Sequence, residues 1–349
     1  MKKNIVLCLA MMALIMSSCK NDDISISRQV SFEVTPYEVV KKWIPYVLNE
    51  SSITELYSNQ QLRINLLVYD LNGNLIASDT RMLKDYNENM VTNIELADGE
   101  YTVVAISDVV ENGMDFCWTI KGTERLSTLI IENITTKIKN EEEIVGIGNA
   151  QITVDANHSF HHVEMHPAGA LVIVKDANMP FWEGFVAYSY LYSTKLNNTY
   201  TFNNNGSYVP IAEENSNFNF RIHYNFPEWM QSNKIYWEYH FIQPFGHTTF
   251  QWRMLVYNEE GGTDEMVYKD TYQANIKEMH VYEFFFDWPN LEWSLNDITT
   301  NAMTSVGGGR DIHAGTMKAN MRRGEEKCNR EPLGDCPVVS KEILETIKK

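Results

Sequence analysis

Both ends of the chain lack aromatic residues. The 349-residue sequence contains 15 Phe, 8 Trp and 18 Tyr, yet the first aromatic residue is Phe32 and the last is Trp293. Because large rings supply much of the apolar burial that offsets chain entropy, we expect the packed body to lie within 32–293. That length is enough for one large domain or two ordinary ones, and the two ends need separate explanations.

Basic residues are scarce within this body. Residues 32–293 hold 16 Lys and Arg against 36 Asp and Glu, which is a formal charge of −20. Nucleic-acid binding requires a cationic surface that displaces phosphate counterions, so this charge argues against a nucleic-acid partner. We expect an acidic body that is exposed to water.

The amino-terminal apolar run is too short to span a membrane. Residues 5–16 are apolar, follow a Met-Lys-Lys start and precede Ser-Ser-Cys, which is the order of a secretory signal. Small residues directly before Cys19 resemble a bacterial lipobox, in which the thiol receives a diacylglyceryl group before cleavage. We therefore predict a lipoprotein signal peptide over 1–18, lipidation of Cys19 and a tether over 19–29. The alternative is an ordinary secreted protein in which Cys19 is incidental.

The four residues after Cys19 are Lys-Asn-Asp-Asp. They resemble the short acidic signal that sends lipoproteins of the Bacteroidetes to the outer face of the outer membrane, although a solvated tether explains the same charges. Acyl chains would hold the protein durably, because each buried methylene contributes about 0.8 kcal/mol. We expect a lipid-anchored protein of the cell outer membrane, with its body exposed at the surface.

Cysteines are few, and the predicted location determines their chemistry. Cys8 would leave with the signal, and the remaining thiols would meet an oxidising environment. Cys328 and Cys336 flank a short segment with Pro and Gly, so we predict a local disulfide. Zinc is the alternative, but a closed site needs four ligands. Cys117 stands between Phe and Trp and is predicted to be a small buried residue.

Helical signals are also few, and most of the body alternates with the two-residue period of strands. Leu62–Tyr69 alternates, Asp70–Asn74 is rich in turn residues and Leu75–Ala77 begins a partner strand, which predicts a hairpin. A second strand–turn–strand unit follows over Asn93–Ile106. Tyr37–Leu48 predicts a short helix that a proline interrupts.

Many strands without alternating helices predict an all-β protein of two antiparallel β-sandwiches in series. We expect an amino-terminal sandwich over 30–156, a carboxy-terminal sandwich over 157–293, and a linker with a Cys-containing tail over 294–349. The further strand candidates are Ile144–Val154, Ala170–Val174, Phe185–Tyr192, Phe218–Tyr224, Ile235–Ile242, Phe250–Tyr257, Met266–Tyr268 and Val281–Phe286.

Residues 158–166 contain four of the nine histidines and are the densest candidate site. As one strand they would place His162, Glu164 and His166 on a single face, where they could present ligands to zinc or copper. A solvated histidine face is the simpler interpretation, and we expect no metal and no cofactor. Neither a Gly-x-Ser-x-Gly nucleophile nor a His-Glu-x-x-His motif occurs, so no enzymatic activity is predicted.

The first strands resemble a known family. The lipobox, a strand near Val30–Val34, the Leu62–Asn74 strand and turn, and Ile94–Ala105 together resemble the fimbrillin and fimbrial-anchor lipoproteins of Bacteroidetes, the Mfa-like and FimB-like group. The likeness covers roughly residues 19–106. Its Leu-x-x-Gly-x-Tyr-x-Val-x-Ala pattern also occurs in other transthyretin-like sandwiches.

The resemblance implies two transthyretin-like domains, no enzymatic activity, and a role in building or tethering a surface pilus for adhesion, with other fimbrial subunits as partners. It also implies strand exchange between polymerising subunits and removal of an amino-terminal strand after an Arg, for which Arg28 is the candidate. Residues 338–349 look helical and offer no donor strand, which favours an anchor, accessory or tip subunit.

A glycan-binding surface lipoprotein is the alternative function. Trp and Tyr crowd the second half of the sequence, for example at Trp237, Trp252 and Trp293. Exposed rings there could stack on sugars, whereas buried rings would belong to the sandwich core.

Overall fold

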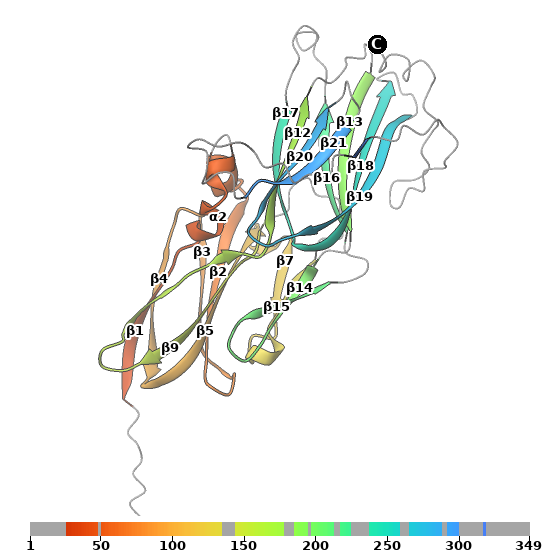
Figure 1. Ribbon diagram of the computed structural model, residues 1–349. Coiled ribbons are helices and arrows are strands. Elements are labelled where there is room, and N and C mark those ends of the chain that lie inside the picture. Colours follow the sequence, from red (N-terminus) through yellow and green to blue (C-terminus); the bar gives the residue numbers. More distant parts are fainter. Residues whose placement is uncertain are drawn as a thin grey trace, which may run out of the picture.

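The computed structural model describes residues 26–47, 50–134, 144–177, 185–194, 197–212, 217–224, 237–258, 265–287, 292–299 and 317–318. These residues form 22 strands in five sheets, together with a few short helices (Figure 1). The predicted all-β fold class is confirmed. Among the described residues, no helix is both long and apolar enough to cross a membrane.

Three of the sheets build the amino-terminal body. They have the strand orders β10-β1-β4, β11-β9-β5-β2-β3 and β15-β14-β8-β7, with β6 paired to β5. We name them the β1 sheet, the β5 sheet and the β14 sheet. Their strands are β1 (Ser27–Val34), β2 (Gln60–Tyr69), β3 (Leu75–Leu83), β4 (Met90–Ala97), β5 (Gly99–Glu111), β6 (Met114–Asp115), β7 (Trp118–Lys121), β8 (Ile130–Asn133), β9 (Gly146–Val154), β10 (Phe160–Val163), β11 (His166–Pro167), β14 (Asn197–Phe202) and β15 (Tyr208–Ala212).

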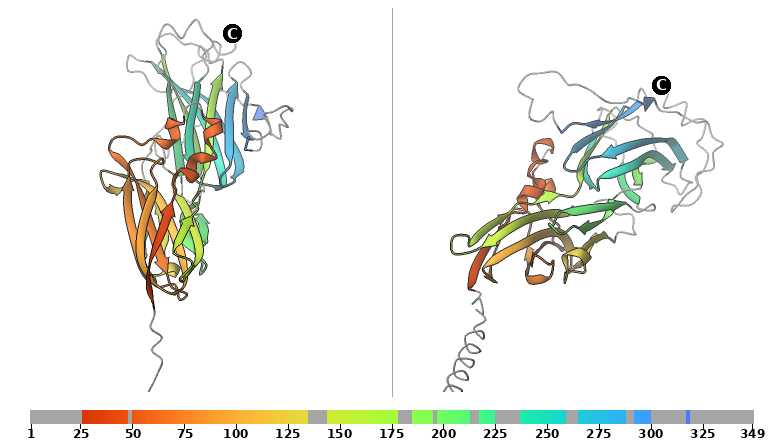
Figure 2. Two further views of the ribbon diagram at one scale, coloured as in Figure 1. Left: turned by 90° about the vertical axis from the view of Figure 1, so that its left-hand side faces the viewer. Right: turned by 60° about the horizontal axis from the view of Figure 1, so that its bottom comes forward.

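The other two sheets form the carboxy-terminal sandwich. Their strand orders are β17-β12-β20-β21-β22 and β16-β13-β18-β19. The strands are β12 (Ala170–Ala177), β13 (Phe185–Thr194), β16 (Asn217–Tyr224), β17 (Trp237–Gln243), β18 (Gly246–Asn258), β19 (Glu265–Ile276), β20 (Val281–Asp287), β21 (Glu292–Asp297) and β22 (Met317–Lys318). The two halves lie end to end, and β1 begins at the end of the molecule opposite the carboxy-terminal sandwich (Figures 1 and 2).

The β5 sheet is the middle layer of the amino-terminal body. Val103 and Ala105 of β5 pack into the same core cluster as the β1 sheet, whereas Val104 and Ile106 pack into a second cluster with the β14 sheet. Because both faces of β5 are covered, its central residues Val103–Ile106 are all apolar instead of alternating. That apolar run thus follows from its place between two layers.

Three short helices follow β1 at the end of the amino-terminal body that faces the carboxy-terminal sandwich (Figure 1). They are α2 (Tyr37–Lys41), η1 (Ile44–Tyr46) and α3 (Ser51–Thr54), and a separate turn, η2 (Leu126–Thr128), precedes β8. Val39, Val40 and Trp43 are fully buried in the core. The predicted proline interruption is confirmed, because α2 ends before the η1 turn that contains Pro45.

The first predicted hairpin is confirmed, whereas the second predicted unit has a different arrangement. The strands β2 and β3 pair antiparallel from Leu62↔Leu83 to Tyr69↔Leu75. The strands β4 and β5 do not pair with each other, because β4 pairs with β1 and β5 pairs with β2 and β9. The Ala97-Asp98-Gly99 turn therefore carries the chain from one layer to the next, a step that alternation within each strand does not encode.

The predicted division at 156/157 does not coincide with a division between the sheets. Strand β10 lies beyond it and pairs in parallel with β1. The β14–β15 hairpin comes from still later in the sequence, between β13 and β16, and completes the β14 sheet by pairing with β8. In the same way, β21 continues to Asp297, past the predicted end of the sandwich at 293.

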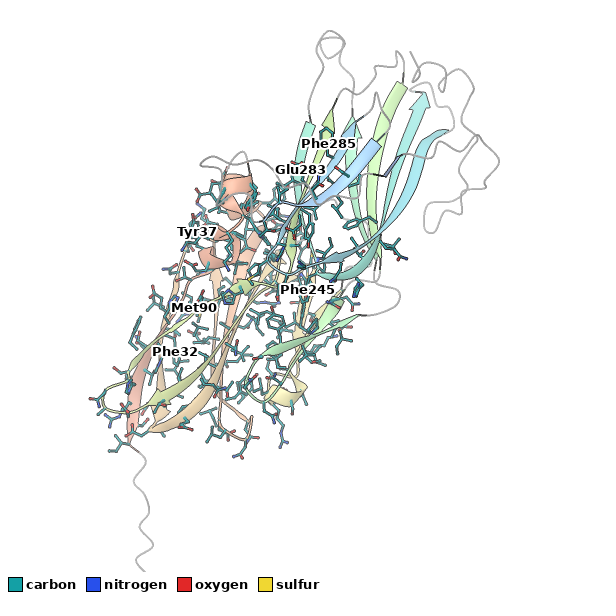
Figure 3. All side chains as sticks on the ribbon, viewed as in Figure 1. Phe32, Tyr37, Met90, Phe245, Glu283 and Phe285 are labelled. Atoms are coloured by element: carbon teal, nitrogen blue, oxygen red, sulfur yellow. The ribbon has the colours of Figure 1, made fainter. Side chains whose placement is uncertain are left out.

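The β14–β15 hairpin packs closely against the amino-terminal body. Tyr200 is buried, donates a hydrogen bond to the Ala168 carbonyl at 2.8 Å, and lies against the ring of Phe245, which marks the boundary between the two halves (Figure 3). Gly206 at the hairpin tip has φ +80°, and a Cβ there would come within 2.8 Å of Thr102. Only glycine suits this turn without displacing the β5 sheet.

Candidate functional site

Strand β1 is the first candidate, because the family resemblance makes it the strand that a protease would remove. It pairs with β4 along its whole length and, from Ser31 onward, in parallel with β10. Its inward side chains Val30, Phe32 and Val34 are all 0% exposed and belong to the core (Figure 3). Burying such side chains contributes about 1.5–3 kcal/mol each, so β1 is an integral strand of the body.

Arg28, at the start of β1, forms an ion pair with Asp98. Its Nε and Nη2 donate hydrogen bonds to the two carboxylate oxygens of Asp98, on the turn after β4. The hydrogen bond to Asp98 raises the pKa of Arg28. A cut after Arg28 would leave Gln29–Val34 paired with β4 and Ser31–Val34 also paired with β10. The next arginine, Arg63, already belongs to β2. Cleavage at the predicted arginine would therefore separate the tether but would not release β1.

The three metal candidates do not share a strand. His162 lies on β10, where its Nδ1 is 3.8 Å from the Glu33 carboxylate of β1. Glu164 lies between strands, and His166 lies on β11, which pairs with β9 in the β5 sheet. The chain passes from one layer to the next after Val163, so the single face predicted from a continuous strand does not form. The described part of the chain contains no group of three or more His, Cys, Asp or Glu residues that could hold a metal ion.

His161 alternates with His162 and points inward. Its ring centroid is 5.8 Å from that of Phe32, and its Nε2 is buried without a hydrogen-bond partner. Burial lowers the pKa of His161, which therefore favours the neutral ring. On β10, His161 therefore packs against Phe32, whereas His162 points outward.

The joint between the two halves is the second candidate. Leu171, Ile173 and Val281 of the carboxy-terminal sandwich belong to the same core cluster as the amino-terminal helices. The backbone N–H of Met279 donates to the carbonyl of Gly169, between β11 and β12, at 2.7 Å. The N–H of Leu171 on β12 donates to the His280 carbonyl at 3.0 Å, within the carboxy-terminal sandwich. Lys277–His280, the turn between β19 and β20, therefore sits against the segment that connects the halves. We call it the joint turn.

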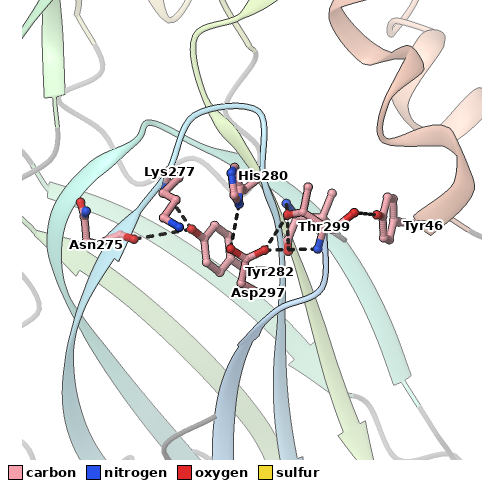
Figure 4. A network of polar contacts seen from close by, with 8 residues as sticks. Tyr46, Asn275, Lys277, His280, Tyr282, Asp297 and Thr299 are labelled. Atoms are coloured by element: carbon pink, nitrogen blue, oxygen red, sulfur yellow. Dashed lines mark hydrogen bonds and ion pairs between the residues drawn. The ribbon is translucent and has the colours of Figure 1, made fainter. Parts of the chain in front are cut away.

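A chain of polar contacts runs from the joint turn to the amino-terminal helices (Figure 4). The His280 Nδ1 lies 2.7 Å from an Asp297 carboxylate oxygen, and the Thr299 hydroxyl donates to the other oxygen at 2.6 Å. The Thr299 carbonyl accepts a hydrogen bond from the Tyr46 hydroxyl of η1. Burial alone would raise the pKa of Asp297, but hydrogen bonds from Thr299 and His280 lower it below its usual value.

Two further residues place charge at the joint turn. Burial raises the pKa of Glu278 to about 7, and its Oε1 is buried without a hydrogen-bond partner. The Lys42 Nζ approaches from the end of α2 and lies 3.7 Å from the Met279 sulfur. The joint therefore combines an apolar core, the chain of polar contacts from His280 to Tyr46, and the half-buried Glu278 carboxyl group.

The remaining predicted residues have different outcomes. Cys19, Cys328 and Cys336 lie outside the described residues. Cys117 is fully buried, which confirms its predicted role as a small core residue. Trp237, Trp252 and Trp293 lie on β17, β18 and β21, but their side chains are outside what the structure describes.

Sequence reasoning missed the joint entirely. Tyr46 and Thr299 are 253 positions apart, and His280 and Asp297 are 17 apart. No motif or period links such residues, because their proximity depends on how the two halves pack. A Glu directly after Lys in a short turn was the one local signal, and it is indistinguishable from a solvated charge.

No protein-family model matches the chain, and no curated protein matches it. The chain is similar to solved structures of surface proteins. A candidate adhesin from Bacteroides thetaiotaomicron has 14% sequence identity and a TM-score of 0.44, with 78% of this chain and 95% of that chain covered. A fimbrial assembly protein from Parabacteroides distasonis has 14% identity and a TM-score of 0.39, covering 84% and 100%. Mfa2, the fimbrial anchor protein of Porphyromonas gingivalis, has 9% identity and a TM-score of 0.38, covering 77% and 98%.

These solved structures are adhesins and fimbrial proteins of Bacteroidetes, the group that residues 19–106 of this chain resemble.

Proposed function

We propose that the protein is a non-enzymatic surface lipoprotein of the fimbrial type, acting in adhesion as an anchor, accessory or tip subunit. Acylated Cys19 holds it at the outer membrane, and other fimbrial subunits are its partners. The observation that carries the proposal is β1, which pairs with β4 along its whole length, pairs with β10 from Ser31 onward, and is buried along one face. A subunit of this kind caps or tethers a pilus without passing on a strand.

The free edge of the β14 sheet supports the same proposal. Strand β15 is its end strand, and Pro210 stands in the middle of that strand. Proline has no N–H to donate to an added strand, so this edge resists extension by another chain.

The short tether and the position of β1 also indicate how the anchored protein is oriented relative to the membrane. Six residues separate Cys19 from Ile26, and an extended chain advances at most about 3.6 Å per residue. The start of β1 lies opposite the carboxy-terminal sandwich (Figure 1). In the anchored protein the amino-terminal body is therefore near the bilayer, and the carboxy-terminal sandwich is presented to partners.

Metabolic labelling with an alkyne palmitate in a Bacteroidetes host tests the lipid anchor. The wild-type chain incorporates the label and stays in the outer-membrane fraction, whereas Cys19→Ala loses both properties. Cys8→Ala is the matched control, because Cys8 belongs to the predicted signal and should not affect labelling. A wild-type chain without lipid would contradict the proposal.

The tail carries a smaller proposal. We expect Cys328 and Cys336 to form a local disulfide in the exported protein. Peptide mass mapping without reduction would detect the linked pair, and free thiols at both positions would refute it.

A further inference from the structure

Three Asn-Gly pairs occur in the sequence, and each lies at a turn between two strands. They are Asn72-Gly73, Asn112-Gly113 and Asn205-Gly206. Asparagine is a chemically labile residue, and it is most labile before glycine, whose missing Cβ leaves the next peptide nitrogen open to approach. That nitrogen attacks the side-chain carbonyl carbon of the asparagine. The hydrogen bonds of the glycine N–H and of the asparagine side chain therefore decide which pair reacts.

The first pair, on the β2–β3 turn, is held by hydrogen bonds on both sides of its glycine. The Gly73 N–H donates to the Asp70 carbonyl at 2.9 Å, and the Gly73 carbonyl accepts from the Leu126 N–H at 2.8 Å. The Asn72 N–H also donates to the Asp70 carboxylate at 2.9 Å. The nitrogen that would attack Asn72 is therefore engaged, and the turn around it is fixed.

The third pair, at the tip of the β14–β15 hairpin, is held against the β5 sheet. The Gly206 N–H donates to the Asn203 carbonyl at 3.0 Å, and the Asn205 side-chain oxygen accepts from the Ser207 N–H at 3.0 Å. The Asn205 carbonyl accepts a further hydrogen bond from the Gln151 side chain at 3.0 Å. Both reacting groups of this pair are thus engaged.

The middle pair, on the turn between β5 and β6, lacks these restraints. Asn112 and Gly113 have φ values of 52° and 76°, and both residues are exposed. The Asn112 N–H donates to the Asn59 carbonyl at 2.8 Å, but no acceptor among the described residues binds the Gly113 N–H. A Cβ added to Gly113 would meet no atom within 4 Å beyond its chain neighbours. The attacking nitrogen is therefore open to solvent.

The strand that follows this turn is short. Strand β6 contains two residues and pairs with β5 at two positions, and its Met114 is 68% exposed. The ion pair of Asp115 with Arg63, at 2.7 Å, is a further restraint. The turn has to shift before the Gly113 nitrogen reaches the side chain of Asn112, and so short a strand opposes that local opening weakly.

We propose that Asn112 is a site of spontaneous deamidation in the mature protein. The Gly113 nitrogen attacks Cγ of Asn112, its proton leaves with the side-chain amide nitrogen as ammonia, and a cyclic succinimide forms. Water then adds to either carbonyl of the ring and opens it, which gives aspartate or isoaspartate at position 112 without oxidation or reduction. The site goes beyond the proposed anchoring role, because the reaction requires neither the lipid nor a fimbrial partner.

The two products have different effects on the turn. Aspartate keeps the length of the main chain, and Asp-Gly suits the same two-residue turn. Isoaspartate adds one carbon to the main chain, so β6 loses its register with β5 and Asp115 is displaced from Arg63. Isoaspartate therefore opens the β5–β6 hairpin, whereas aspartate leaves it closed.

Incubation of the folded mature protein in heavy-oxygen water tests the site. Each hydrolysed succinimide takes up one heavy oxygen, and digestion in ordinary acidic water leaves later deamidation unlabelled. Peptide mass spectrometry should find label at Asn112, in isoaspartate and aspartate, about tenfold faster than at Asn72 or Asn205, because each hydrogen bond that must open first slows the reaction. In urea, where the turns are lost, all three peptides should take up label at similar rates.

Two variants separate this reaction from other damage. Asn112→Gln keeps an amide but forms only a larger ring slowly, so its peptide should stay unlabelled. Asn112→Asp carries the charge of the product at normal chain length, so hydrogen exchange at Met114 should match wild type, whereas the isolated isoaspartate form should exchange faster. Equal labelling of the three asparagines in the folded protein, label without isoaspartate, or undiminished label in Asn112→Gln would overturn the proposal. Unchanged exchange in the isoaspartate form would refute the opening of the hairpin.

Discussion

Asp108, a fully buried acid in the amino-terminal body, and Glu278, a half-buried acid at the joint, have opposite surroundings. Asp108 on β5 is 0% exposed and accepts hydrogen bonds from Arg63 Nε at 2.9 Å and Nη2 at 2.6 Å. Glu278 has a buried oxygen without a partner. Burial raises the pKa of both groups, to about 6 for Asp108, where Arg63 opposes the rise, and to about 7 for Glu278.

The two carboxyl groups differ in whether their charged form has a cationic partner. In the amino-terminal body, deprotonated Asp108 has a fixed cation, and Arg63 also binds Asp115 at 2.7 Å, so charge there is part of the structure. At the joint, nothing but burial opposes the charge of Glu278. A charged Asp108 is therefore compensated by Arg63, whereas a charged Glu278 is disfavoured by burial.

The largest effect should come from removing the partner of Arg63. Asp108→Asn would leave the half-buried Arg63 guanidinium without its bidentate carboxylate, although the Asp115 contact remains, and breaking such a pair costs up to about 3–5 kcal/mol of unfolding free energy. Urea unfolding of the purified protein measures the loss. Asp115→Asn is the matched control, because that carboxylate is 33% exposed and its removal should cost much less. Equal losses in the two variants would break the contrast between buried and exposed partners.

The joint should respond less, and only locally. Glu278→Gln removes the charge that burial disfavours, so we expect the variant to be more stable than wild type at pH 8 and nearly equal to it at pH 4, where Glu278 is largely protonated in both states. Thermal unfolding at both pH values measures this difference. A variant less stable than wild type at pH 8 would mean that charged Glu278 has a favourable partner.

The hydroxyl of Tyr46 forms a hydrogen bond across the joint. Tyr46→Phe removes the contact with the Thr299 carbonyl, and the expected loss is about 0.5–1.5 kcal/mol. Tyr37→Phe is the control, because its hydroxyl bonds to Glu50 at an exposed position. Hydrogen exchange near Val281 should increase in the first variant alone, and an equal increase in both would show that this hydrogen bond does not hold the joint.

The smallest effect should come from Arg28. Its contact with Asp98 is partly exposed, and such ion pairs contribute little to stability. Arg28→Gln should leave the unfolding midpoint unchanged and should only remove the target of an arginine-specific protease. A large loss of stability would show that the start of β1 depends on this ion pair more than on its buried face.

Local sequence patterns predicted individual strands and turns. The alternation in Leu62–Tyr69 and the turn after it predicted β2 and β3, and Pro45 predicted that the helix over Tyr37–Leu48 is interrupted. The parallel pairing of β10 with β1 and the return of β14–β15 to the first body were not predictable, because strand periodicity does not determine which strands become neighbours. The same limit applied to His162 and His166, whose sequence spacing is correct for one strand but whose strands lie in different sheets.

The mature amino terminus tests the central claim most directly. The account predicts that protein purified from the cell surface begins at lipidated Cys19 and retains β1, as intact-mass measurement and sequencing of the amino-terminal peptide would show. A mature chain that begins at Gln29, or that lacks Val30–Val34, would contradict it.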